Sequence, residues 1–309
     1  MAEGENLSKR RKLEKRRRAT ILTTAADVTT NQTPADYALG YTDAEQERLM
    51  RQAALIAPYT ERLFREAGIG MGHRVLDLGS GMGDVSMLVA GLVGVSGEVV
   101  GIERDAASIE RAQARVARAG FRNVTFLKTD VNEIVIDQRF DAVVGRFVLM
   151  FLPDPVSVLR SVSRLVRAGG VLAFQEPSWA PMLALGSRLP LWSKLLASIH
   201  ETALRSGMNM EMGLALYRVF QEAGLPAPNM HLEIALGSDI DFLRVTSDLL
   251  CSLQPLAAQH NVSLKELGDL DTLLDRICAE IAAANTVVSV VPLLGAWSRK
   301  PADIPRSAE

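Results

Sequence analysis

The 309-residue sequence predicts an α/β fold in which a mostly parallel sheet is covered by helices on both faces. Between residues 74 and 176, short apolar segments alternate with longer amphipathic segments, as strands alternate with helices in such folds. The short segments are almost continuously apolar, which is typical of parallel strands buried on both faces. Hydrophobic residues make up 48% of the chain and charged residues 23%, so the composition supports a large globular core.

The expected elements follow in a regular order. We expect strands at 74–78, 98–103, 123–130, 140–146 and 170–176, and helices at 84–93, 106–119 and 155–167, the last ending at the glycines after Ala168. Before them, Thr42 and Glu45 form a capping box for a helix that reaches Pro58, and a second helix follows to Gly68. After residue 176 the regular alternation of strand and helix patterns ends. Helical patterns cover 183–224, 239–259 and 265–285, and strand-like patterns cover 231–236 and 287–300.

Charge is distributed unevenly along the chain. Residues 1–18 contain 8 basic and 3 acidic residues, whereas the remainder carries a net charge of −7. The basic cluster at 9–18 is typical of a nucleic-acid arm, but also of a solvated helix or a subunit-contact arm. An RNA-binding enzyme would be expected to carry basic patches on its body too, so nucleic acid is the less favoured partner and a homo-oligomer contact stays open.

The cysteines, histidines and apolar runs limit the possible compartments and cofactors. Cys251 and Cys278 lie in helical patterns and are predicted to be buried apolar residues of a protein from a reducing, cytoplasmic compartment. The four histidines form no HxxxH or HxH pattern, so no metal site is expected. No apolar run approaches the roughly 18 residues that would span a bilayer, and no apolar segment typical of a signal peptide follows the basic N-terminus. We therefore expect no membrane partner.

A glycine-rich turn, DLGSGMG at residues 77–83, follows the first predicted strand. Gly79 and Gly81 would allow a tight turn and let a ligand approach the backbone without an intervening Cβ. The spacing is GxGxG, not the GxGxxG of dinucleotide sites. Asp77 and Asp84 flank the turn, and two carboxylates would repel a pyrophosphate but attract a positive charge. S-adenosylmethionine, which carries a sulfonium and an ammonium and no phosphate, satisfies these requirements.

Further acidic residues end the next two predicted strands. Glu103 closes the second strand about two dozen residues after the turn, where a carboxylate can accept both hydroxyls of a ribose. Asp130 and Val131 follow the third strand and could contact the amino group and the ring of an adenine. Taken singly, each of these carboxylates could instead be an ordinary cap of a strand end. Their order on one βαβαβ unit favours an adenosine site.

With these motifs, residues 70–176 resemble the core of class I S-adenosylmethionine-dependent methyltransferases. The family's first motif matches VLDLGSGMG at 75–83, and its segment after the fourth strand matches residues 145–155. The resemblance implies a Rossmann-like seven-stranded sheet whose last strand is antiparallel, completed by 231–236 and 287–300. It also implies S-adenosylmethionine as cofactor, with Asp77, Gly79 and Gly81 at the methionine moiety. The full set of expected cofactor residues adds Tyr37, Ser80, Glu103, Arg104, Asp130, Val131 and Arg146.

The leader at residues 37–52 resembles one found in bacterial small-molecule members of this family, where it closes over the cofactor. By that resemblance, Tyr37 would shield the sulfonium through a cation–π contact, and Arg48 or Gln52 would hold the methionine carboxylate. The alternative is an amphipathic helix that docks on the sheet and exposes its polar residues.

Candidate catalytic residues lie beyond the cofactor motifs. Glu176 ends the fifth predicted strand, and in an apolar pocket its raised pKa would suit a general base. Alternatively it caps the following turn or bonds a backbone amide. His200 is a second base candidate, or a packed helix residue, and Arg146 could meet an anionic substrate group or pair with an acid.

We therefore expect a cytoplasmic, metal-independent enzyme that methylates O, N or C of an apolar small molecule. The predicted organisation is a basic tail and linker at 1–36, a helical cap at 37–69, a cofactor core at 70–176, a methionine-rich helical lid with two strands at 177–300, and a tail at 301–309. Two alternatives stay open: a methyltransferase that holds RNA or protein with its basic arm, and a non-catalytic binding module of the same fold.

Overall fold

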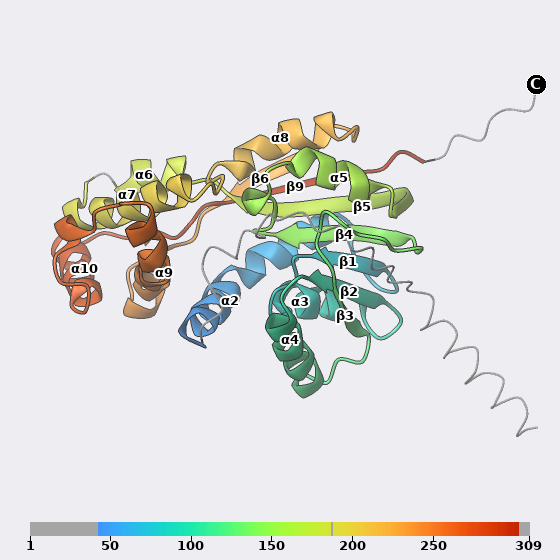
Figure 1. Ribbon diagram of the computed structural model, residues 1–309, viewed down its shortest axis with the longest axis horizontal. Coiled ribbons are helices and arrows are strands. Elements are labelled where there is room, and N and C mark those ends of the chain that lie inside the picture. The colour runs from blue at the N-terminus through green and yellow to red at the C-terminus, as the bar shows by residue number, and fades with distance from the viewer. Residues whose placement is uncertain (1–42, 187, 303–309) are drawn as a thin grey trace, which may run out of the picture.

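The computed structural model describes residues 43–186 and 188–302 (Figure 1). Tyr37, the capping residue Thr42 and the basic cluster at 9–18 lie outside this part of the chain, so the expectations placed on them remain expectations.

A seven-stranded mixed sheet forms the centre of the protein. Its strands lie in the order β3-β2-β1-β4-β5-β9-β6, and β9 is antiparallel to both of its neighbours. The strands are β1 (Arg74–Leu78), β2 (Glu98–Glu103), β3 (Val124–Lys128), β4 (Phe140–Arg146), β5 (Val166–Pro177), β6 (Asn229–Glu233) and β9 (Leu293–Arg299). This confirms the α/β fold with a parallel core and an antiparallel last strand.

Helices cover both faces of the sheet because the central strands β1, β2, β4 and β5 are apolar on both sides. On one face, α2 (Asp43–Glu66) and α3 (Asp84–Val93) pack against side chains such as Val75 and Val144. On the other, α5 (Pro155–Ser163) and α8 (Met212–Glu222) pack against side chains such as Leu76 and Leu172. Helix α4 (Ala106–Arg118) packs along β2 and β3.

The remaining helices form a lid at one end of the sheet (Figure 1). They are α6 (Ala180–Gly186), α7 (Pro190–Arg205), α9 (Ile240–Gln259) and α10 (Leu273–Ala283), accompanied by the short 3-10 helix η2 (Lys265–Leu267) and the two-stranded sheet of β7 (Leu236–Gly237) and β8 (Val288–Ser289). The chain enters the lid directly from the end of β5. The lid therefore lies next to the carboxyl ends of the parallel strands, where open α/β sheets bind ligands.

Two predicted boundaries are wrong. The helix expected to stop at Pro58 continues as one helix to Glu66 with this proline inside it, because Ile56 before it and Leu63 after it are both buried. The helix expected at 155–167 ends at Ser163, because Val166 already pairs with Phe140 as the start of β5. The expected glycine cap thus lies inside a strand.

The late segments are also more divided than the sequence predicts. The pattern at 231–236 splits into β6 and β7, and the pattern at 287–300 splits into β8 and β9. Cys251 is exposed on α9 and Cys278 is half-buried, so the prediction that both are buried is wrong. In the described part of the chain, no helix combines the length and the apolar character that crossing a membrane would require.

Candidate functional site

The glycine-rich turn joins β1 to α3 at the carboxyl edge of the sheet. Gly79, Gly81 and Gly83 have φ values of 61°, 50° and 81°, a region that side chains other than glycine rarely adopt. A Cβ atom at Gly79 would lie 2.8 Å from Cγ2 of Val148, whereas one at Gly81 would meet nothing within 4 Å. Gly79 is thus packed against the chain after β4, and Gly81 borders open space. The hydroxyl of Ser80, between them, is buried and has no hydrogen-bond partner among the described residues.

Glu103, at the end of β2, connects that strand to the turn. Its carboxylate accepts the backbone N–H of Gly81 at 3.0 Å, and also those of Arg104 at 2.8 Å and Asp105 at 3.0 Å. The side chain of Arg104 points to solvent. The carboxylate predicted to face a ribose therefore also fixes the shape of the turn.

Asp77 is a buried carboxylate directly before the turn, with 1% of its surface exposed. Ser86 donates a hydrogen bond to it at 2.6 Å. Burial raises the pKa of Asp77 to about 7, while the bond from Ser86 and the positive charge of Arg146 act in the opposite direction. The carboxyl is therefore poised to ionise near neutral pH.

Asp84 behaves differently from the sequence expectation. It forms an ion pair with Arg115, with Oδ1 2.6 Å from Nη2, and the same guanidinium donates to the backbone carbonyl of Met82 at 2.7 Å. The charge of Asp84 is therefore already balanced within the described structure.

Asp130 and Val131 follow β3 at the same edge of the sheet. The Asp130 carboxylate accepts the backbone N–H of Asn132 at 2.8 Å and its side-chain amide at 2.6 Å. Val131 is half-buried against the main apolar core. The contacts of Asp130 are those of a turn-forming aspartate, and its role at an adenine stays a prediction.

Arg146 ends β4 and takes part in a series of side-chain hydrogen bonds that the sequence did not predict. Its Nη1 donates to the hydroxyl of Thr60 at 3.0 Å, and that hydroxyl donates to Oε1 of Gln175 at 2.6 Å. Burial lowers the pKa of Arg146, and the carboxylates of Asp84 and Asp77 oppose this shift. The side-chain amide nitrogen of Gln175 is buried without a partner among the described residues. These hydrogen bonds join α2 to the ends of β4 and β5.

Glu176 is fully buried at the end of β5. Its carboxylate accepts three consecutive backbone N–H groups, from Val148 at 3.0 Å, Leu149 at 2.9 Å and Met150 at 3.3 Å. These residues enter the 3-10 helix η1 (Leu149–Phe151). Burial raises the pKa of Glu176 to about 7, and the three N–H groups act against this shift. Both carboxylate oxygens are thus engaged in holding the chain after β4, as the backbone-bonding alternative expects.

The other base candidate, His200, lies on α7 and packs against an aromatic ring. Its imidazole centroid is 6.2 Å from the ring centroid of Trp179, at an interplanar angle of 32°. Trp179 is itself held by Glu211, whose carboxylate accepts the backbone N–H groups of Trp179 at 2.9 Å and Ala180 at 2.8 Å. This contact matches the alternative of a packed helix residue.

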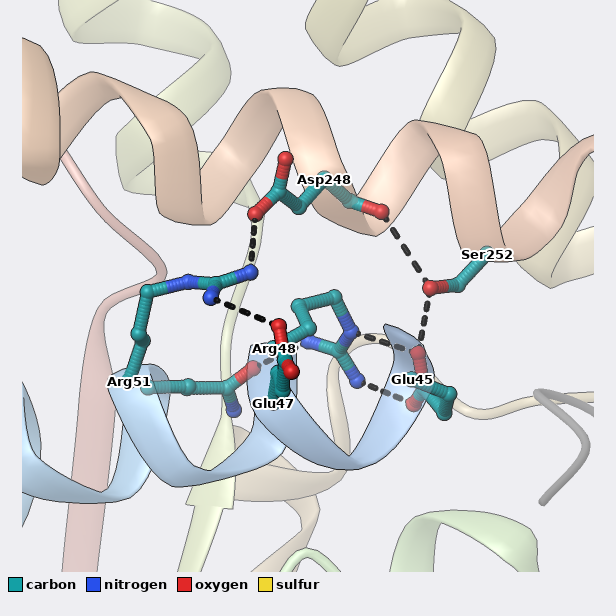
Figure 2. Close-up of polar contacts among 7 residues, drawn as sticks. Glu45, Glu47, Arg48, Arg51, Asp248 and Ser252 are labelled. Atoms are coloured by element: carbon teal, nitrogen blue, oxygen red, sulfur yellow. Dashed lines mark hydrogen bonds and ion pairs between the residues drawn. The ribbon is translucent and has the colours of Figure 1, made fainter. Parts of the chain in front are cut away.

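Arg48 is engaged within α2. Its guanidinium donates to both carboxylate oxygens of Glu45, at 2.8 and 2.6 Å, and to Oε1 of Gln52 at 2.6 Å. Glu45 also accepts a hydrogen bond from Ser252 on α9 (Figure 2). A second bridge joins Arg51 to Asp248 at 2.6 Å. In this structure Arg48 therefore balances a buried carboxylate and helps to join α2 to the lid.

An apolar pocket lies between α2, the lid helix α9 and the chain after β5. Its free volume is about 20 Å³, which is room for about one water molecule. Apolar side chains form most of its wall, together with two polar residues, Gln52 and Thr246. The apolar wall residues are Leu55, Ile56, Trp179, Met182, Val245, Leu249, Val290 and Val291. Trp192, Met208 and Met210, from the region predicted to form the methionine-rich lid, are buried in the main apolar core.

The sequence matches a family model described as "Methyltransferase domain" over residues 69–224. It is 33% identical over 141 residues to the ubiquinone/menaquinone biosynthesis C-methyltransferase UbiE of Coxiella burnetii. The aligned region covers 42% of this chain and 56% of the relative. The UbiE protein of Ectopseudomonas mendocina is 29% identical over 190 residues, covering 58% of this chain and 69% of the relative. The chain thus matches little more than half of the length of the first relative.

Among solved structures, a putative methyltransferase from Bacillus halodurans superposes with a TM-score of 0.53 at 18% identity, covering 78% of this chain and 98% of that one. A likeness at this identity supports the fold alone. The family model covers half of the chain and includes the turn, β1 to β5 and the residues at their carboxyl ends. The chain therefore belongs to the methyltransferase domain family, within the class I S-adenosylmethionine-dependent methyltransferases.

Proposed function

We propose that this protein binds S-adenosylmethionine at the β1–α3 turn and transfers its methyl group to an apolar small molecule. The observation that carries the proposal is the open space beside Gly81, whose backbone N–H is held by Glu103, in a turn that directly follows the buried carboxylate of Asp77. A side chain at Gly81 would occupy this space, and the unpartnered hydroxyl of Ser80 lies in the same turn. These features suit a ligand that carries positive charge and approaches the backbone closely.

When bound, S-adenosylmethionine supplies a methyl group that its sulfonium already activates. The protein's own task is to place the acceptor in line and to exclude water. Asp77 would attract the cationic part of the cofactor. We keep Glu103 as the proposed acceptor of the ribose hydroxyls, and Asp130 and Val131 as the proposed contacts of the adenine. The lid and α2 would close the carboxyl edge of the sheet against solvent.

For Glu176 we propose a positioning role. A general base has to reach the proton that it removes. The side chain of Glu176 is fully buried, and both of its oxygens accept backbone N–H groups. By holding Val148, which packs against Gly79, it would set the wall of the cofactor turn. His200 remains the second base candidate, and its ring contact with Trp179 supports a packing role instead.

We propose carbon as the first acceptor atom to test, because the relatives that match the chain are named C-methyltransferases. Oxygen and nitrogen acceptors remain outcomes of the same experiment. The protein is incubated with cofactor carrying an isotopically labelled methyl group and with a metabolite extract, and mass spectrometry identifies which small molecules gain the label. Calorimetry with S-adenosylhomocysteine tests the cofactor site separately, and an absence of binding would refute the proposed function.

The alternative of a macromolecular substrate depends on the basic cluster at 9–18, which lies outside the described residues. Deletion of residues 1–18 separates the two cases. Loss of activity on every substrate, with unchanged cofactor binding, would favour the macromolecular enzyme.

A further inference from the structure

The apolar pocket contains a polar side chain that is held in a fixed orientation. Gln52 lies on α2, is half-buried and lines the pocket. Its carbonyl oxygen accepts a hydrogen bond from Nη1 of Arg48 at 2.6 Å. Arg48 is 2% exposed and is held in turn by both oxygens of Glu45. Because Oε1 is bound by a guanidinium, which only donates, the amide of Gln52 cannot flip without losing this bond.

This arrangement leaves the donor end of the amide available. Within residues 43–186 and 188–302, the amide nitrogen of Gln52 has no hydrogen-bond partner. The second polar residue of the wall, Thr246, has a hydroxyl that can both donate and accept. Apart from the indole N–H of Trp179, the described wall residues therefore carry one donor-only group, the amide nitrogen of Gln52, among mostly apolar side chains.

The charge of the pocket is also defined. None of the described residues that line it is charged, and the nearby Arg48 is paired with Glu45. A charged ligand would lose its hydration there without gaining an opposite charge. An uncharged ligand with an oxygen acceptor would satisfy the amide at no such cost.

The pocket is smaller than any organic substrate, so a ligand has to part α9 from α2. The bridges between these helices are polar: Arg51 to Asp248, and Glu45 to Ser252 (Figure 2). The Arg51–Asp248 pair is half-exposed, and water can replace both partners when the helices separate. This pair therefore adds little resistance to opening.

We propose that Gln52 determines substrate specificity, by donating a hydrogen bond from its amide nitrogen to an uncharged carbonyl oxygen of an apolar substrate that binds between α2 and α9. This inference rests on the proposed function, since it names the class of acceptor molecule. It moves Gln52 from the cofactor, where the sequence placed it, to the substrate.

The test uses the full chain with S-adenosylhomocysteine bound and two probes of nearly equal shape, 2-acetylnaphthalene and 2-ethylnaphthalene. Only the first has a carbonyl. Calorimetry should show the ketone binding about tenfold more tightly than the hydrocarbon to the unaltered protein, the effect of one hydrogen bond in an apolar site.

The decisive variant is Gln52→Glu, which keeps an acceptor for Arg48 and replaces the donor nitrogen with oxygen. In Gln52→Glu the preference for the ketone should disappear. Thr246→Val is the matched control, since it removes the other polar group of the wall, and there the preference should persist. Circular dichroism melting verifies that both variants fold.

The binding measurements distinguish a failure of the proposed function from a failure of the inference about Gln52. If S-adenosylhomocysteine does not bind, the proposed function itself fails. If it binds but neither probe does, or if both probes bind equally to the unaltered protein, the inference about Gln52 is overturned. Loss of the preference in Thr246→Val, with its retention in Gln52→Glu, would overturn it as well.

Discussion

The affinity for S-adenosylhomocysteine should rise about tenfold between pH 6 and pH 8, because Asp77 ionises in this interval. Burial raises the pKa of Asp77 to about 7, so the carboxyl is roughly 10% ionised at pH 6 and roughly 90% at pH 8. A ligand with an ammonium group favours the ionised form. When only a fraction of the protein is competent to bind, the apparent affinity falls in proportion to that fraction.

Calorimetry at pH 6, 7 and 8 measures this change, and the use of two buffers with different ionisation enthalpies gives the number of protons released. Near pH 7 the release should approach half a proton, since about half of the carboxyl is then protonated. Asp77→Asn removes the titrating group and keeps a side chain of similar shape. Its affinity should be lower at pH 8 and should follow only the ionisation of the ligand.

Equal affinities at pH 6 and pH 8 in the unaltered protein, or an identical pH profile in Asp77→Asn, would refute the reasoning. The sign of the accompanying stability change gives an independent check. The raised pKa means that the folded protein holds more protons than the unfolded chain between about pH 4 and pH 7. The contribution of Asp77 to stability therefore falls as the pH rises through this interval, and the Asn variant should lack that fall.

Three pairs of substitutions test the packing of the site. Glu176→Ala should lower the free energy of unfolding by about 3 kcal/mol or more in urea titrations, because it leaves three buried N–H groups without an acceptor. Glu176→Gln should lower it less. A stable Glu176→Gln variant without turnover would instead indicate that Glu176 acts as a base. Arg48→Ala should cost about 3–5 kcal/mol because it removes the ion-pair partner of the buried Glu45 carboxylate, whereas Arg51→Ala, on the same helix, should cost less than about 1 kcal/mol. Gly81→Ala should abolish S-adenosylhomocysteine binding in calorimetry with a stability loss of about 1 kcal/mol. Gly79→Ala should lose more stability, because its Cβ would lie 2.8 Å from a neighbouring side chain. Equal stability losses for the two variants would contradict the assignment of the open side to Gly81.

Local patterns were sufficient to predict the core of the fold. The strands β1, β2 and β4 begin and end where their apolar runs do, and the parallel arrangement brings Asp77, Glu103 and Arg146 to one edge of the sheet. The glycine turn was predictable for the same reason, since positive φ values demand glycine. These features depend on neighbours in the sequence or on a regular topology.

The contacts that complete the site depend on residues far apart in the sequence. Thr60 lies 115 positions before Gln175, and no periodicity links the two. The amides that bind Glu176 are backbone groups, which the sequence does not distinguish. The pair Glu45–Arg48 is spaced i,i+3 and could have been predicted from the helix, and it would have shown that Arg48 already has a partner.

Strand β9 lies between β5 and β6, although it is made after both of them. On the ribosome, β6 emerges about 60 residues before β9 (residue 233 against residue 293), and it has no partner in the sheet until then. In the nascent chain, β5 meanwhile offers an open edge of the kind that pairs with other chains. Helices α9 and α10 are synthesised during this delay, so the lid exists before the sheet beneath it is closed. Nascent chains arrested within this interval should therefore be the form of this protein that is most prone to aggregate and most dependent on chaperones.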